Sequence, residues 1–226
     1  MWRVRTLFLD VASHSGLIAA VSADAVVASR QIDHRINDSE LVPAIEGVVK
    51  KAGWKWDDLT RIACVCGPGG FTSLRVGVSA ANALAWGLKI PSAAIHLSDL
   101  YAARAISCQL SAVSEKNISS PKSLKLKANS FIWIHSTKKT ALFLRGFGNY
   151  RNLAPEAELM PLEDIIRILP DDAPLIGEII PEHEEALFKR GLSLAKLRPI
   201  EEILPEFLAA QNYSEQTIQP WYGRGI

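Results

Sequence analysis

The fold class follows from residues 61–88, which read RIACVCGPGGFTSLRVGVSAANALAWGL. Arg61 and the five apolar residues after it predict a buried strand over 61–66, and the pattern from Thr72 to Leu88 predicts a helix. Between them, Gly67-Pro68-Gly69-Gly70 allows a tight reversal, because glycine adopts backbone conformations that other residues avoid. A buried strand, a turn and a long helix together predict an α/β protein.

Three short apolar runs precede this unit, at residues 4–9, 17–22 and 25–32. Connections this short require antiparallel neighbours. Apolar residues then recur at helical spacing from Leu41 to Ala52, predicting a helix over residues 38–52 that Gly53 ends. After residue 88 the pattern predicts a strand over 92–95 and a helix over about 98–105. A three-stranded meander followed by parallel strands with intervening helices resembles the ribonuclease-H-like pattern of the actin, sugar kinase and Hsp70 superfamily.

The second half of the chain predicts a smaller α/β domain. Residues 106–130 are rich in Ser, Lys and Asn with little periodicity and predict a linker or surface excursion. A strand pair is expected at residues 131–134 and 141–144, and helices at 162–169, 182–190 and 199–210. The predicted division is therefore an N-terminal domain over 1–105 and a C-terminal domain over 106–226.

Composition favours a globular protein of the reducing cytoplasm. Apolar residues make up 48% of the chain, and 25 basic residues nearly balance 24 acidic ones, so the net charge gives no case for tight nucleic-acid binding. Three cysteines are too few for a disulfide framework. We expect neither a secretory leader nor a membrane-spanning helix. Whether the lysine-rich stretch 115–139 contacts RNA stays open.

The motifs for catalysis are incomplete. The Gly67–Gly70 turn could present backbone amides to an anion, but Thr72-Ser73-Leu74-Arg75 stands where a Walker loop needs Gly-Lys-Ser/Thr. Asp10 ends the first strand, as a nuclease metal ligand would, yet the fourth strand ends in Cys66-Gly67 instead of an acid. The five histidines have no metal-ligand spacing. We therefore predict no catalytic residue, cofactor or metal, although composition alone does not exclude a Ser-His-Asp hydrolase.

The second predicted helix is rich in small residues, among them Gly77, Ala80, Ala81 and Ala83. Small side chains let another backbone approach closely, so this helix can pack on its own sheet and on a partner. With the apolar stripe of the first helix it would form a two-helix surface of the kind that marks an interface. The alternative is burial beneath the second domain of the chain itself.

The segment Gly67-Pro68-Gly69-Gly70-Phe71-Thr72-Ser73-Leu74-Arg75-Val76-Gly77 resembles the Gly-Pro-Gly-Ser-Phe-Thr-Gly-Leu-Arg-Ile-Gly signature of the bacterial TsaB (YeaZ) family. Leu9-Asp10, Ser39-Glu40-Leu41-Val42-Pro43 and the ending Pro220-Trp221-Tyr222-Gly223-Arg224 are also similar to family segments. Gly70 and Ser73 depart from the signature, and Asn37 stands where the family often has His. The chain is thus similar to a divergent member, with good coverage over about its first hundred residues.

This resemblance implies an actin-like fold and a non-catalytic subunit of the machinery that makes N6-threonylcarbamoyladenosine at position 37 of tRNA. It implies that two helices form a bundle with the catalytic subunit TsaD and that the ATPase TsaE joins the assembly, with tRNA contacted only indirectly. The alternative is an independent peptidase-like or nucleotide-dependent enzyme of the superfamily. A further alternative is a homodimer through the same helices when the partner is absent, because one apolar face can serve both contacts. The predicted partner-binding residues are Leu41, Ile45, Val48, Val49, Arg75, Gly77, Ala80, Ala81 and Leu84.

Overall fold

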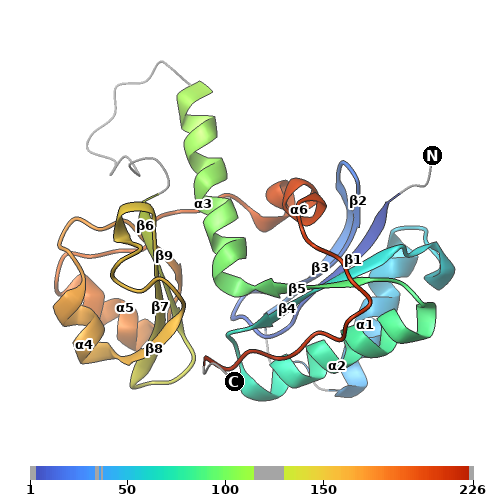
Figure 1. Cartoon of the computed structure of the whole chain (residues 1–226), viewed down its shortest axis with the longest axis horizontal. Coiled ribbons are helices and arrows are strands. Elements are labelled where there is room, and N and C mark those ends of the chain that lie inside the picture. The colour runs from blue at the N-terminus through green and yellow to red at the C-terminus, as the bar shows by residue number, and fades with distance from the viewer. Residues whose placement is uncertain (1–3, 34–35, 37, 115–129, 224–226) are drawn as a thin grey trace. The chain divides into compact units, whose positions relative to one another are not determined.

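A computed structural model describes residues 4–33, 36, 38–114 and 130–223, which form two compact units (Figure 1). The first unit comprises Met1–Leu97 and Ile200–Ile226, and the second comprises Ser98–Pro199. The predicted boundary lay between residues 105 and 106, whereas the second unit begins at Ser98. The prediction also placed residues 200–226 in the second domain, whereas the chain returns to the first unit at Ile200. Among the described residues, no helix combines the length and the apolarity needed to cross a bilayer.

The first sheet has the order β3-β2-β1-β4-β5. Strands β1 (Arg5–Asp10), β2 (Gly16–Ser22) and β3 (Val26–Ile32) form the antiparallel meander, and β4 (Arg61–Gly67) and β5 (Ser92–His96) extend it in parallel. The predicted ribonuclease-H-like topology is confirmed. A short 3-10 turn, Trp56–Asp58, leads into β4.

Helices α1 (Asp38–Lys51) and α2 (Phe71–Leu88) cover one face of this sheet, and α6 (Ile200–Ala209) lies on the other (Figure 1). The core between the sheet and α1 and α2 contains Leu7, Leu9 and Ile18 from the strands. Cys64 and Cys66 also belong to it, as buried thiols that pack like small apolar side chains. Gly53, with φ of +72°, follows α1 and ends it as predicted.

The second unit holds a sheet of order β8-β7-β6-β9, formed by β6 (Phe131–Ser136), β7 (Ala141–Phe147), β8 (Glu158–Pro161) and β9 (Leu175–Glu178). Pairs β6·β7 and β7·β8 are antiparallel, whereas β6·β9 is parallel. This order repeats β3-β2-β1-β4 of the first sheet, with α4 (Leu162–Ile168) in the place of α1. The two sheets thus repeat one topology.

The remaining elements of the second unit are α3 (Leu97–Ser114), α5 (Pro181–Phe188) and the 3-10 turn Gly148–Tyr150. The predicted linker over residues 106–130 is wrong at its start, since α3 continues to Ser114, and residues 115–129 lie outside the described part of the chain. Strands β8 and β9 were not predicted, because four residues give too short a pattern to read.

Candidate partner-binding surface

The turn before α2 is shaped by close contact between backbones. Gly67 has φ of +138°, and a Cβ atom there would lie 2.2 Å from the carbonyl oxygen of Trp221. A Cβ atom on Gly69 would lie 2.6 Å from the carbonyl oxygen of Ala12, and the amide of Gly70 donates to that same oxygen at 2.9 Å. These glycines are therefore explained by the approach of the chain itself, which favours the structural interpretation of the turn over an anion-binding one.

Most of the predicted partner-binding residues lie in the core of the first unit. The buried ones are Leu41, Ile45, Val48, Val49, Gly77 and Ala81. The apolar stripe of α1 faces the sheet, so it cannot also be the outer surface. Ala80 and Leu84 are half-buried, and Arg75 is exposed. The surface open to another chain is therefore formed by the residues on the opposite sides of the two helices.

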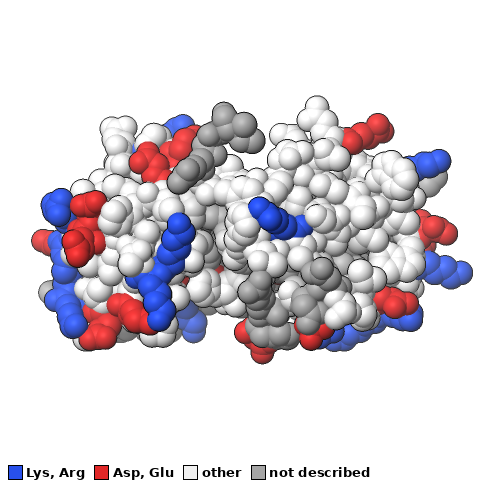
Figure 2. Space-filling model, turned by 90° about the horizontal axis from the view of Figure 1, so that it is seen from below, with Lys and Arg blue, Asp and Glu red and all other residues white. Residues whose placement is uncertain are grey.

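That outer side has its own apolar groups. Val42 on α1 and Phe71 and Trp86 on α2 are exposed by 59%, 54% and 85%. We define the α1–α2 face as nine of the exposed residues of the two helices, namely Val42, Pro43, Gly47, Phe71, Arg75, Ser79, Ala83, Trp86 and Gly87. The exposed residues Ser39, Glu40, Lys50, Lys51 and Thr72 of the same helices are not included in this set. Figure 2 views the molecule from this side and shows an area over α2 that is white apart from one basic side chain, with further acidic and basic residues toward the borders. Exposed apolar area of this kind marks interaction sites.

Small residues separate the large ones on this face. Gly47 and Gly87 both have open space where a Cβ atom would stand, and Ala83 is exposed between Ser79 and Gly87. On α2 these positions recur every three or four residues, so they form one stripe along the helix. A helix of another chain could approach this stripe closely.

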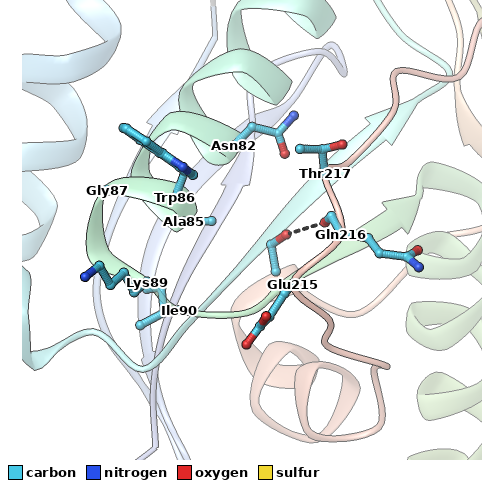
Figure 3. A pocket seen from close by; sticks show the side chains of 10 residues that line it. Asn82, Ala85, Trp86, Gly87, Lys89, Ile90, Glu215, Gln216 and Thr217 are labelled. Atoms are coloured by element: carbon cyan, nitrogen blue, oxygen red, sulfur yellow. Dashed lines mark hydrogen bonds between the residues drawn. The ribbon is translucent and has the colours of Figure 1, made fainter.

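A cavity of about 560 Å³ opens at the carboxyl end of α2 (Figure 3). Its walls are the last turn of α2, the start of β5 and residues 215–217 of the C-terminal segment. Asn82 points toward that segment, whereas the indole of Trp86 points away from it. The cavity thus adjoins the α1–α2 face at Trp86.

Asp10 ends β1, where a nuclease would hold a metal ion, and its carboxylate instead accepts hydrogen bonds from the turn that follows β1. Its Oδ1 accepts hydrogen bonds from the amides of Ala12 and Ser13, both at 3.2 Å, and its Oδ2 accepts one from Ser13 Oγ at 2.5 Å. Within the described ranges, no group of three His, Cys, Asp or Glu side chains is placed to hold a metal ion. Burial raises the pKa of the Cys64 thiol well above its ordinary value, which opposes a nucleophilic thiolate there.

Sequence reasoning missed one Ser–His contact in the second unit. His183 Nε2 lies 2.8 Å from the carbonyl oxygen of Lys139, so that nitrogen donates, and Nδ1 accepts a hydrogen bond from Ser136 Oγ at 2.7 Å. Ser136 and His183 are exposed by 1% and 0%, so the hydroxyl is closed to a substrate. The pair ties β6 to α5, and because its members are 47 positions apart no sequence pattern pointed to it.

Comparisons with known proteins converge on one group. A family model described as TsaD, tRNA N6-adenosine threonylcarbamoyltransferase, matches residues 30–112, which contain α1 and α2. The tRNA threonylcarbamoyladenosine biosynthesis protein TsaB of Bacillus subtilis is 32% identical over 98 residues, which are 43% of this chain and 43% of that protein. The TsaB protein of Escherichia coli is 27% identical over 39% of this chain and 38% of its own length. The sequence matches thus span less than half of these relatives.

Similarity of structure extends further along the chain. YeaZ from Pseudomonas aeruginosa superposes with a TM-score of 0.62 over 96% of this chain and 99% of that one, at 17% identity. At this identity the superposition establishes a shared fold, in both units, and nothing finer.

Proposed function

Because the chain is a divergent member of the TsaB (YeaZ) family, we propose that it takes part in the biosynthesis of tRNA N6-threonylcarbamoyladenosine as a non-catalytic subunit. In this proposal it binds a catalytic TsaD-type threonylcarbamoyltransferase and is not itself an enzyme. The observation that carries it is the α1–α2 face, whose exposed valine, phenylalanine and tryptophan lie within residues 30–112, the stretch that the TsaD family model matches.

The mechanism follows from the physical form of that face. Small residues on α2 and α1 would let two helices of the partner pack closely against them, giving a helical bundle whose contacts are apolar. Phe71 and Trp86 stand at the two ends of α2, so each would fill a gap beside the close central contact. Aromatic residues at such positions commonly dominate binding energy.

Further parts of the proposal depend on this interface. A TsaE-type ATPase would join the assembled pair, tRNA would be bound chiefly by the catalytic subunit, and the site of action would be the cytoplasm. In the absence of the partner, the same face of two copies could associate as a homodimer, because one exposed apolar surface serves both contacts.

The experiment mixes the purified chain with the TsaD-type protein of the same source and measures complex mass and affinity. We expect a defined complex, and we expect Ala83→Arg to weaken it by at least ~30-fold, because a long charged side chain would stand in the closely packed stripe. Ala209→Arg is the matched control, since Ala209 is also an exposed helical alanine but lies on α6. No complex at high concentration, or equal losses for both variants, would count against the proposal.

The independent-enzyme alternative is examined with the same protein. A stoichiometric metal or micromolar affinity of the isolated chain for ATP would favour it. Peptidase activity that Ser136→Ala removes would do the same, although the burial of Ser136 argues against that outcome.

A further inference from the structure

The C-terminal segment of the chain runs back along α2 and is attached to the first unit at several points (Figure 1). Ser214 and Ser92 exchange two backbone hydrogen bonds of 2.9 and 2.8 Å, which extends the edge of the sheet beside β5. Asn82 of α2 donates from Nδ2 to the carbonyl oxygen of Ile218 at 2.9 Å, and its Oδ1 accepts from the amide of the same residue at 2.8 Å. The segment is therefore a fixed part of this unit.

The attachment continues to the turn that precedes α2. The amide of Trp221 donates to the carbonyl oxygen of Cys66 at 2.7 Å, and the Trp221 ring meets the His96 ring edge-on with centroids 4.6 Å apart. Gly67 has no side chain where the Trp221 carbonyl passes. These contacts fix the backbone position of the next residue, Tyr222.

Tyr222 comes to lie against two residues at the start of α2. Its ring centroid is 5.0 Å from that of Phe71, and its hydroxyl accepts a hydrogen bond from Arg75 Nε at 3.2 Å. The Arg75 guanidinium carbon lies 3.8 Å from the centre of the Phe71 ring. We call Phe71, Arg75 and Tyr222 the aromatic–arginine cluster. It joins residues 147 positions apart, and Phe71 and Tyr222 keep 54% and 39% of their surface exposed.

The cluster holds a guanidinium in a defined orientation with part of it turned to solvent. The Phe71 ring covers one face of the Arg75 guanidinium, and Arg75 Nε donates to the Tyr222 hydroxyl. The two terminal amino groups of Arg75 therefore remain to make hydrogen bonds. In the part of the chain that the structure describes, no carboxylate forms an ion pair with Arg75, and the first turn of α2 contains no acidic residue. Two parallel N–H donors in this form match the two oxygens of a carboxylate.

We propose that the aromatic–arginine cluster is the anchor of the α1–α2 face for a carboxylate side chain of the protein partner, and that the C-terminal segment is therefore part of the interface. This inference rests on the proposed function and adds to it a charged contact and a third element of the binding surface. The cluster is continuous with the apolar face through Phe71, and a guanidinium supported by aromatic rings loses little entropy on pairing. A protein carboxylate fits better than an RNA phosphate, because the surrounding α2 surface is uncharged and not basic (Figure 2).

The test measures the affinity of the TsaD-type partner by titration calorimetry at low and at moderate salt. For Arg75→Gln we expect a loss of about 10- to 100-fold and a weaker salt dependence, as for removal of a charge-assisted pair. Tyr222→Ala should lose about 5- to 20-fold, because the guanidinium is then supported on one side only. Arg167→Gln is the matched control, an exposed arginine of α4 that pairs with Asp164, and it should bind as the unchanged protein does.

Each outcome separates the two proposals. If the unchanged chain binds the partner and Arg75→Gln and Tyr222→Ala bind within ~2-fold of it, the anchor is refuted while the proposed function stands. If the unchanged chain forms no complex, the proposed function fails and the anchor fails with it. If the variants keep the partner but lose affinity for a tRNA anticodon stem-loop, the cluster binds RNA phosphate and the inference is overturned. The paired carboxylate is identified by exchanging the two charges. Arg75→Glu in this chain should recover binding when the paired Asp or Glu of the partner is changed to Lys.

Discussion

Replacing Asn82 by alanine should release the C-terminal segment without unfolding the sheet. The side chain makes two hydrogen bonds to the backbone of Ile218, and Ile218 is only 4% exposed, so its amide and carbonyl have no water to replace the lost partner. Each neutral bond contributes a net of about 1 kcal/mol to stability. The closed arrangement of the segment should therefore lose ~2 kcal/mol, which corresponds to about 30-fold in the population of the open form.

The assay is amide hydrogen exchange at Trp221, whose N–H is bonded to Cys66 at 2.7 Å and is protected only while the segment is docked. In Asn82→Ala we expect exchange at this amide to rise about 30-fold, whereas amides of β1 keep their rates. Ser79→Ala is the matched control, since Ser79 lies exposed on the same helix. Asn82→Asp keeps the acceptor for the Ile218 amide and loses the donor, so it should give an intermediate rate. An increase below ~3-fold in Asn82→Ala would refute the reasoning.

Four further substitutions or treatments test the buried contacts of both units and the proposed face. Gly69→Ala should lower the free energy of unfolding in urea by about 1–3 kcal/mol, because its Cβ would lie 2.6 Å from the Ala12 carbonyl oxygen. Gly47→Ala meets open space and should instead raise stability by up to ~1 kcal/mol while weakening partner binding; unchanged binding would place Gly47 outside the interface. Burial raises the pKa of the Cys64 thiol, so Cys64 should resist iodoacetamide at pH 8 in the folded protein and react after unfolding, as peptide mass mapping can check. The unfolded thiol has a lower pKa and loses its proton first. The free energy of unfolding should therefore fall as pH rises above about 8.5. His183→Leu should cost about 2–4 kcal/mol in thermal unfolding of the second unit, because the Ser136 hydroxyl and Lys139 carbonyl lose their buried partner; a loss below ~1 kcal/mol would contradict this.

Helices and strands of the first unit were predictable because their patterns are long and clearly bounded. The predicted helix over 72–88 begins one residue later than α2 and ends with it, and Gly53 follows α1 as expected. The second unit was harder to predict, since β8 and β9 have four residues each and α3 runs nine residues beyond the predicted end at residue 105. Periodicity over four residues does not separate a strand from a loop.

The sequence predicted a partner-binding site on the helices α1 and α2, and six of its nine predicted residues lie buried in the core of the first unit. The stripe of Leu41, Ile45 and Val49 has the periodicity of a buried helix face, and a single sequence does not tell whether the sheet or a partner covers it. The structure assigns that stripe to the sheet and leaves Val42, Phe71 and Trp86 outside. Val42 directly follows Leu41 and Trp86 directly follows Ala85, so apolarity along the chain did not separate these exposed residues from the buried ones.

The sequence by itself determined the strand and helix order of the first unit and the turn that joins β4 to α2, because both depend on residues that are neighbours along the chain. Only the tertiary structure decided that residues 200–226 belong with the first unit and that Tyr222 meets Arg75. It also decided which side of each helix stays exposed. Such contacts join residues more than a hundred positions apart, and their formation depends on the packing of the whole unit rather than on any local preference.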